Sequence, residues 1–193
     1  MATYTETMRR VHGRELSWPL DLGARVLLAN LLLVLASKIA FPLPWTPVPL
    51  TLQTLGVLLI AIFFGPRISA VAAGLYLVEG AAGLPVFQPF GAPGAARLFG
   101  PTAGFLLAFP MAAYGTGRLL EFAGSGKGVR QWMANVAAMV PGEALILFCG
   151  WAWLSVLVGV QSAWVHGVAP FLAGECAKVG AAAAIACGLG RED

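Results

Sequence analysis

The fold class is decided by an apolar stretch that reads LGARVLLANLLLVLASKIA over residues 22–40 and continues as FPLPWTPVP over residues 41–49. The first part is close to the roughly 20 apolar residues that a helix needs to cross a bilayer. The second part is also apolar, but its prolines remove backbone donors and fix φ, so it ends the helix. A non-helical backbone at membrane depth must be covered by protein or water. The stretch therefore predicts a membrane-spanning helix followed by an irregular segment.

The composition of the whole chain points the same way. Of its 193 residues, 59% are hydrophobic and only 11% are charged, and the mean hydropathy is +0.80. A soluble domain usually carries about 25% charged residues. The composition thus indicates an integral membrane protein and excludes a soluble enzyme. The basic residues are scattered and form no patch, so we expect no nucleic-acid partner.

Six apolar segments are candidates for spans, and we predict an all-α membrane protein with six transmembrane helices in one bundle. Residues 1–21 form a polar tail, and residues 22–190 form the transmembrane domain. Two segments begin in the same way, because Phe-Gly-Pro at 64–66 and at 99–101 places proline at the first helical position. We expect Pro110 to kink its helix. The predicted spans are residues 22–40, 49–64, 66–82, 101–120, 133–157 and 170–189.

The distribution of lysine and arginine predicts the orientation in the membrane, because cytoplasmic loops carry an excess of these residues. With a cytoplasmic N-terminus, the outer loops hold only Arg97. We therefore expect a multi-pass protein of the bacterial cytoplasmic membrane with both termini in the cytoplasm. The basic residues then on the inner side are Arg9, Arg10, Arg14, Arg67, Arg118, Lys127, Arg130 and Arg191.

This orientation places the proline-rich segment and residues 83–100 outside. Their apolar residues suggest loops that fold down over a cavity. The alternative is that both loops sit in the membrane interface, with Trp45 and Phe87 as anchors.

The strongest candidates for a functional site are Glu175 and Lys178. They are three residues apart and so share one face of the last predicted helix. A charge at mid-membrane costs about 2.5–3.5 kcal/mol, so such residues usually face a cavity or a partner. The two side chains either neutralise each other or present an acceptor and a donor to one polar ligand group. They lie in the outer half of the span, which favours a site open to the outside.

Other polar residues within or near the spans have weaker claims. Glu143 is as consistent with packing as with ligand contact, and Glu79 with simple solvation. Gln53 either binds a ligand or satisfies freed backbone groups. Arg97 either attracts an anionic solute or only holds its loop. Arg25 and Lys38, near the ends of the first predicted span, are expected to reach the membrane interface.

The sequence offers little for catalysis. It has no H-E-x-x-H motif and no phosphate-binding glycine loop. We therefore predict a protein that is not an enzyme and has no metal, no cofactor and no ATPase of its own. Any ATP-driven transport requires a partner.

Four segments in order resemble the biotin-specific S components, the BioY family, of energy-coupling factor (ECF) transporters. They cover the chain from about Leu22 to Leu189. One departure is Ala103, where the family often has a second glycine. These segments are TPVPLTLQT at residues 46–54, GAAGLPVF at 80–87, FGPTAGF at 99–105 and GECAK at 174–178.

The resemblance implies an S-component fold that captures biotin near the outer face, beneath the first and third loops. It makes Glu175 and Lys178 the polar pair of the biotin site. Glu175 would accept ureido N–H bonds, and Lys178 would donate to the ureido carbonyl or to the carboxylate. Arg97 would meet the carboxylate at the mouth. The remaining implied contacts are Trp45, Tyr76 and Phe87 on the ring and chain, and Gln53 on the loop or the head group.

The resemblance also implies partners. An S component docks on a transmembrane T component with ATP-binding subunits and topples to release biotin, although some members work alone or as oligomers. S components often carry an early A-x-x-x-A face for the T component, and here the match is Ala36 to Ala40. Rival hypotheses are an S component for another vitamin, a membrane scaffold without solute, and an intramembrane enzyme that uses Glu79, Glu143 or Glu175.

Overall fold

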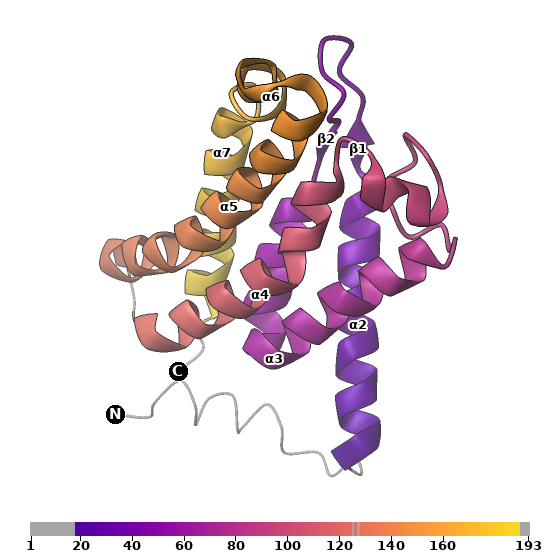
Figure 1. The fold of residues 1–193 in the computed structure, drawn as a ribbon. Coiled ribbons are helices and arrows are strands. Elements are labelled where there is room, and N and C mark those ends of the chain that lie inside the picture. Colours follow the sequence, from indigo (N-terminus) through magenta and orange to yellow (C-terminus); the bar gives the residue numbers. More distant parts are fainter. Residues whose placement is uncertain (1–17, 125, 127, 190–193) are drawn as a thin grey trace.

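The computed structural model describes residues 18–189 except 125 and 127, and Figure 1 shows them as a bundle of helices. Most of the expected polar tail, and with it Arg9, Arg10 and Arg14, lies outside the described residues, as do Lys127 and Arg191. The elements are α2 (Trp18–Lys38), β1 (Ala40–Phe41), β2 (Leu50–Thr51), α3 (Gln53–Ala81), the 3-10 helix η1 (Gly94–Phe99), α4 (Ala103–Ala123), α5 (Gly128–Val158), α6 (Val160–Gly167) and α7 (Leu172–Leu189).

Helix α3 contains two of the predicted spans, separated by a break at the Gly65–Pro66 pair. Gly65 has φ 73° and ψ 179°, which is not helical, and Pro66 starts the second half. This confirms the predicted role of this proline. Helix α4 packs closely against the break, because a Cβ on Gly117 would lie 2.7 Å from Pro66 Cα. Pro110 and Pro141 lie inside α4 and α5, which continue past them.

The helices have the length and surface of membrane spans. Among the described residues, α3 and α5 each meet the length and hydropathy needed to cross a bilayer, and α6 with α7, bent by 51°, is a third candidate. Large apolar side chains also face outward, as expected for a surface in contact with lipid. On α2 these exposed side chains are Leu27, Leu28, Leu31 and Leu35.

Small residues bring the helices together. Ala36 of α2 packs against α3, because a Cβ on Gly56 would lie 2.8 Å from Ala36 Cβ. At least this half of the Ala36–Ala40 pair therefore serves packing within the bundle. Gly104 of α4 lies against the backbone of α5 at Cys149, where a Cβ has no room. Such close contacts are typical of helix packing in membranes, where small residues let backbones approach.

The proline-rich loop, α6 and η1 lie toward one end of the bundle, in the upper part of Figure 1. Strands β1 and β2 pair antiparallel and carry the proline-rich loop between them. Thr46 Oγ1 of this loop donates to the backbone carbonyl of His166 in α6. The sequence suggested only a loop where α6 lies, and the other loop also contains a helix, η1.

The end of α2 holds the segment after α3 in place. Ser37 Oγ donates to Val86 O at 2.6 Å, and Lys38 Nζ donates to Phe87 O at 2.8 Å and also to Pro85 O. Lys38, which we expected to reach the interface, thus binds this segment together with its neighbour Ser37. These bonds tie the segment after α3 to the end of α2.

Candidate ligand-binding site

Glu175 and Lys178 form a buried ion pair on the first turns of α7. Lys178 Nζ lies 2.9 Å from Glu175 Oε1 and donates to Thr51 O at 2.6 Å and to Thr54 Oγ1 at 3.0 Å. An ammonium group has three donors, so these contacts use all of them. Thr54 Oγ1 in turn donates to Glu175 Oε2 at 2.6 Å. The cluster therefore links α7 to the start of α3 and holds the carboxylate of Glu175 in one position.

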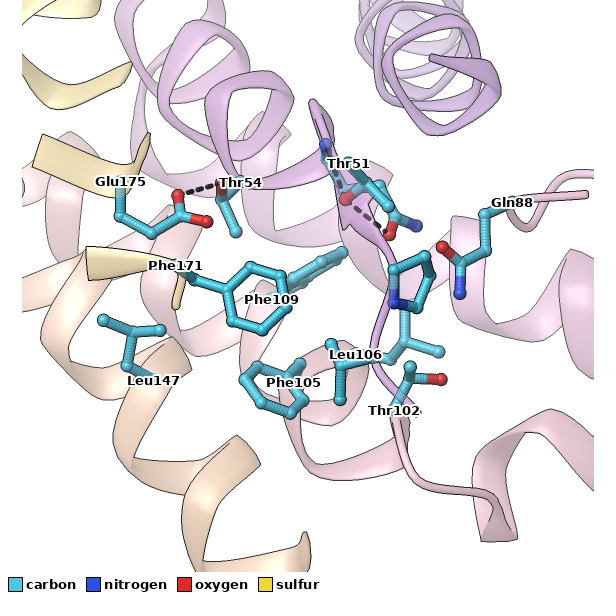
Figure 2. A pocket seen from close by; sticks show the side chains of 13 residues that line it. Thr51, Thr54, Gln88, Thr102, Phe105, Leu106, Phe109, Leu147, Phe171 and Glu175 are labelled. Atoms are coloured by element: carbon cyan, nitrogen blue, oxygen red, sulfur yellow. Dashed lines mark hydrogen bonds between the residues drawn. The ribbon is translucent and has the colours of Figure 1, made fainter. Parts of the chain in front are cut away.

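Glu175 lies at the wall of a small cavity of about 50 Å³, which we call the inner cavity. Figure 2 shows Glu175 and Thr54 at one side of it and Gln88 and Thr102 at the other, with Phe105, Leu106 and Phe109 between them. Ligand sites typically combine apolar walls with a few placed polar groups, and this cavity does so. Its lining consists of Val48, Pro49, Thr51, Gln53, Thr54, Gln88, Thr102, Phe105, Leu106, Phe109, Leu147, Phe171 and Glu175.

A second space of about 260 Å³, the outer cavity, lies between the proline-rich loop and the segment that contains η1. Pro49, Gln88 and Thr102 line both cavities, and we call these three residues the neck. The outer cavity also contacts Arg97. The two cavities are therefore neighbours on either side of the neck, and the outer one has a cation beside it.

Arg97 is held by the loop that it crosses. Its Nη2 donates to Gln88 O at 3.1 Å, and its Nη1 donates to Phe90 O. Burial lowers the pKa of the guanidinium from its usual range, but arginine stays protonated in proteins. The buried Nε has no hydrogen-bond partner among the described residues. Arg97 thus fixes its loop and places a positive charge beside the outer cavity.

The side chain of Gln53 is held in position by hydrogen bonds to residues next to it and behind the cavity wall. Its Nε2 donates to the hydroxyl of buried Tyr76 at 2.6 Å, and its Oε1 accepts from Thr51 Oγ1 at 3.2 Å. The Phe87 ring meets Tyr76 edge-on, with 5.2 Å between centroids and 75° between planes. Phe87 also fills the space beside Gly80, where a Cβ has no room. Tyr76 and Phe87 therefore support the wall and do not line the cavity.

The seven candidate residues from the sequence thus occupy different positions. Gln53 and Glu175 line the inner cavity, and Arg97 lines the outer cavity. Lys178 lies behind Glu175. Trp45, on the tip of the proline-rich loop, is 60% exposed and lines neither cavity.

Several lining residues were not expected. Thr51 and Thr54 flank Gln53 in the segment 46–54, and Thr102 belongs to the segment 99–105, so the motifs contain them. Phe171 lies four residues before Glu175, which is one helical turn. Gln88 follows Phe87, but no motif included it, because its position depends on how the loop folds.

Glu143 of α5 is the remaining buried carboxyl near this site. Both its oxygens lack a hydrogen-bond partner among the described residues, and its charge interacts with those of Glu175 and Lys178. Within the described part of the chain, no three His, Cys, Asp or Glu side chains gather as a metal site.

The fold and the cavities together define a multi-pass membrane protein with internal cavities near one end. The chain belongs to the BioY family, whose family model matches residues 9–192. The family assignment from the four segments is therefore confirmed.

Curated relatives agree with this assignment. The biotin transporter BioY of Rhizobium etli is 33% identical over 89% of this chain and 91% of its own length. The biotin transporter BioY of Thermotoga maritima is 36% identical over 82% of this chain and 89% of its own. The probable biotin transporter BioY of Pyrococcus horikoshii is 35% identical over 72% and 79%.

A solved structure, the S-component for biotin from an ECF-type ABC transporter, has the same fold. It superposes with a TM-score of 0.78 and covers 94% of this chain and 96% of that one, at 20% sequence identity. The predicted all-α S-component fold is therefore confirmed.

Proposed function

We propose that this protein captures biotin from outside the cell and delivers it across the cytoplasmic membrane as the substrate-binding S component of an ECF-type transporter. Membership of the BioY family supports this, as do the relatives that are named biotin transporters. Residues 22–190 form the biotin-binding domain. Because the named relatives are transporters, transport is favoured over a scaffold or an intramembrane enzyme.

The observation that carries the proposal is the distribution of polar groups along the two cavities. A carboxylate, Glu175, lies at one side of the inner cavity, and a cation, Arg97, lies beyond the neck. Biotin has a ureido ring with N–H donors at one end and a carboxylate at the other, joined by an apolar chain. The two ends of the site complement the two ends of this ligand.

The ureido ring binds at Glu175. A carboxylate has about four acceptor sites, and the bonds from Lys178 and Thr54 use two of them. The others remain for N–H groups of the ligand. Lys178 holds the Glu175 carboxylate in place through their ion pair, and Gln53 gives the head group a further polar contact.

The thioether ring and the chain lie against Phe105, Phe109 and Phe171. Biotin's carboxylate points away from Glu175, because like charges repel, and toward Arg97 in the outer cavity. The exposed Trp45 and the loop that carries it close over the mouth once the ligand is bound.

The loops that cover the site face the outside of the cell, and both termini lie in the cytoplasm. A transmembrane T component and ATP-binding subunits supply the energy for release inside, unless the protein acts alone or as an oligomer. Most of the basic residues that flank the spans lie at the ends opposite these loops, which supports this orientation.

The proposal is tested by calorimetric titration of biotin into the detergent-purified protein, beside the variant Glu175→Gln. Glu121→Gln is the matched control, because Glu121 pairs with Arg118 on an exposed surface. We expect one tight site in the wild type and in the control. Glu175→Gln weakens it by at least about tenfold, since hydrogen bonds to charged groups are worth about 1.5–3 kcal/mol. Absence of binding by folded wild type overturns the biotin assignment, and a screen of other vitamins then tests the rival S-component hypothesis.

A further inference from the structure

Gln88 carries a buried acceptor that the contacts described above leave unused. Its side chain lies in the neck between the two cavities, and Figure 2 shows it directed into the inner cavity. The residue is only 5% exposed, and its Oε1 has no hydrogen-bond partner among the described residues. A buried polar atom without a partner is costly, so such atoms usually pair with a ligand or a water.

The backbone on both sides of Gln88 is fixed, so the side chain cannot easily withdraw. Lys38 Nζ holds Phe87 O, and Arg97 Nη2 holds Gln88 O itself. The Phe87 ring is packed against Gly80 and Tyr76. The acceptor is therefore presented to whatever passes through the neck.

Free biotin offers no donor at this point. With its ureido ring at Glu175, its tail brings a carboxylate toward the neck, and a carboxylate only accepts hydrogen bonds. An amide of biotin, in which the tail carboxyl is joined to an amine, instead brings an N–H. The outer cavity, at about 260 Å³, has room for more than a carboxylate.

We propose that the site also admits biotin amides, with Gln88 Oε1 accepting the amide N–H at the neck and the outer cavity holding the amine-derived part. This inference rests on the proposed biotin site. A conjugate of biotin with the side-chain amine of lysine fits best, because its free α-carboxylate reaches the side of the cavity that holds Arg97. Free biotin binds in the same site with the Gln88 amide turned over, so that its NH₂ group meets the carboxylate.

The test is titration of biotin and of biotinyl-lysine into the purified full-length wild type and the variants Gln88→Glu and Gln88→Leu. We expect the wild type to bind both, in competition. In Gln88→Glu the new carboxylate still accepts the amide N–H but repels free biotin, so the ratio of the two affinities shifts by about tenfold or more toward the amide. In Gln88→Leu the acceptor for the amide and the NH₂ donor for free biotin are both lost, so both ligands bind more weakly and the ratio changes little. Gln161→Glu, an exposed glutamine in α6 at the same end of the bundle, is the control and leaves the ratio unchanged.

The outcomes separate this inference from the proposed function. Wild type that binds biotin but not biotinyl-lysine overturns the inference and leaves biotin capture intact. Wild type that binds neither overturns the biotin site itself. Equal weakening of both ligands in Gln88→Glu, or unchanged affinities for both in Gln88→Leu, shows that Gln88 does not read the tail and also overturns the inference. Thermal unfolding of each variant identifies a folding defect, and Gln88→Met, which keeps the side-chain length, replaces Gln88→Leu if that variant is defective.

Discussion

Lys178 and Glu175 are held 2.9 Å apart in a buried pair, but only Glu175 reaches the inner cavity. The three donors of Lys178 go to Glu175, Thr54 and the backbone carbonyl of Thr51. The lysine therefore acts on a ligand through Glu175, whose charge and position it maintains. This division of roles leads to different expectations for the two residues.

Replacing Lys178 with Met should destabilise the protein by about 3–5 kcal/mol, because it leaves the Glu175 charge buried without its partner. Adding Glu175→Gln to this variant should restore most of the thermal stability, since both charges are then gone. Biotin binding should stay weak in the double variant, because the ligand has lost its charged acceptor. Thermal unfolding in detergent measures the first two effects. A double variant no more stable than Lys178→Met alone would show that the pair is not coupled.

Thr54→Val tests the hydroxyl that joins the pair. The side chain keeps its shape but loses the donor to Glu175 Oε2 and the acceptor for Lys178 Nζ. We expect biotin affinity to fall by about tenfold, since a hydrogen bond to a charged group is worth about 1.5–3 kcal/mol. Thr54→Ser keeps the hydroxyl and is the control. Equal affinities of the Val and Ser variants in calorimetry would refute this role of Thr54.

Much of the bundle can be predicted from sequence, because prolines, glycines and the length of an apolar segment determine where a helix begins, breaks and ends. The break at Gly65–Pro66 and the shared face of Glu175 and Lys178 depend only on neighbours along the chain. The positions of Gln88 and Trp45 do not. The loop before Gln88 is held by Ser37 and Lys38 from another helix, and nothing near Gln88 in the sequence reports those bonds. Residues that belong to one motif in the sequence therefore occupy different positions in the structure. Some line the cavity wall, some support that wall from behind, and some lie on an exposed loop.

Tyr76→Phe should weaken ligand binding several-fold without unfolding the protein. It removes the oxygen to which Gln53 Nε2 donates at 2.6 Å and so frees the Gln53 amide at the cavity wall. Loss of a hydrogen bond that leaves a buried donor unpaired costs about 1–3 kcal/mol. Tyr114→Phe, at an exposed tyrosine of α4, is the matched control. Unchanged biotin affinity in Tyr76→Phe would show that the cavity does not depend on this support.

Gly80→Ala should destabilise the protein by about 1–3 kcal/mol, the usual cost of adding volume to a packed site. The new methyl group has no room beside the Phe87 ring, so the segment after α3 must move. Gly74→Ala, in the same helix, meets nothing within 4 Å. It should be neutral or stabilise by up to about 1 kcal/mol through helix propensity. Equal unfolding temperatures of the two variants would contradict the close packing of Phe87 on Gly80.

Glu143→Gln should raise the unfolding temperature and leave the fold unchanged. Glu143, Glu175 and Lys178 interact within the bundle, and this cluster contains two carboxyls and one cation. Lys178 is paired with Glu175, and the Glu143 oxygens have no hydrogen-bond partner among the described residues. An amide of the same shape cannot ionise, so it removes the cost of keeping a second carboxyl beside Glu175 in a buried site. Each 1 kcal/mol shifts the unfolding temperature of a chain of this size by about 2–4 °C.

The control for this change is Glu121→Gln, at an exposed carboxylate paired with Arg118, where surface ion pairs contribute about 0–1 kcal/mol. It should leave the unfolding temperature nearly unchanged. A fall in unfolding temperature for Glu143→Gln would mean that the carboxylate is compensated in the membrane, for example by an ordered water. A rise accompanied by tighter biotin binding would indicate that the Glu143 carboxyl disfavours ligand binding at Glu175. A rise with unchanged binding would confine its effect to stability.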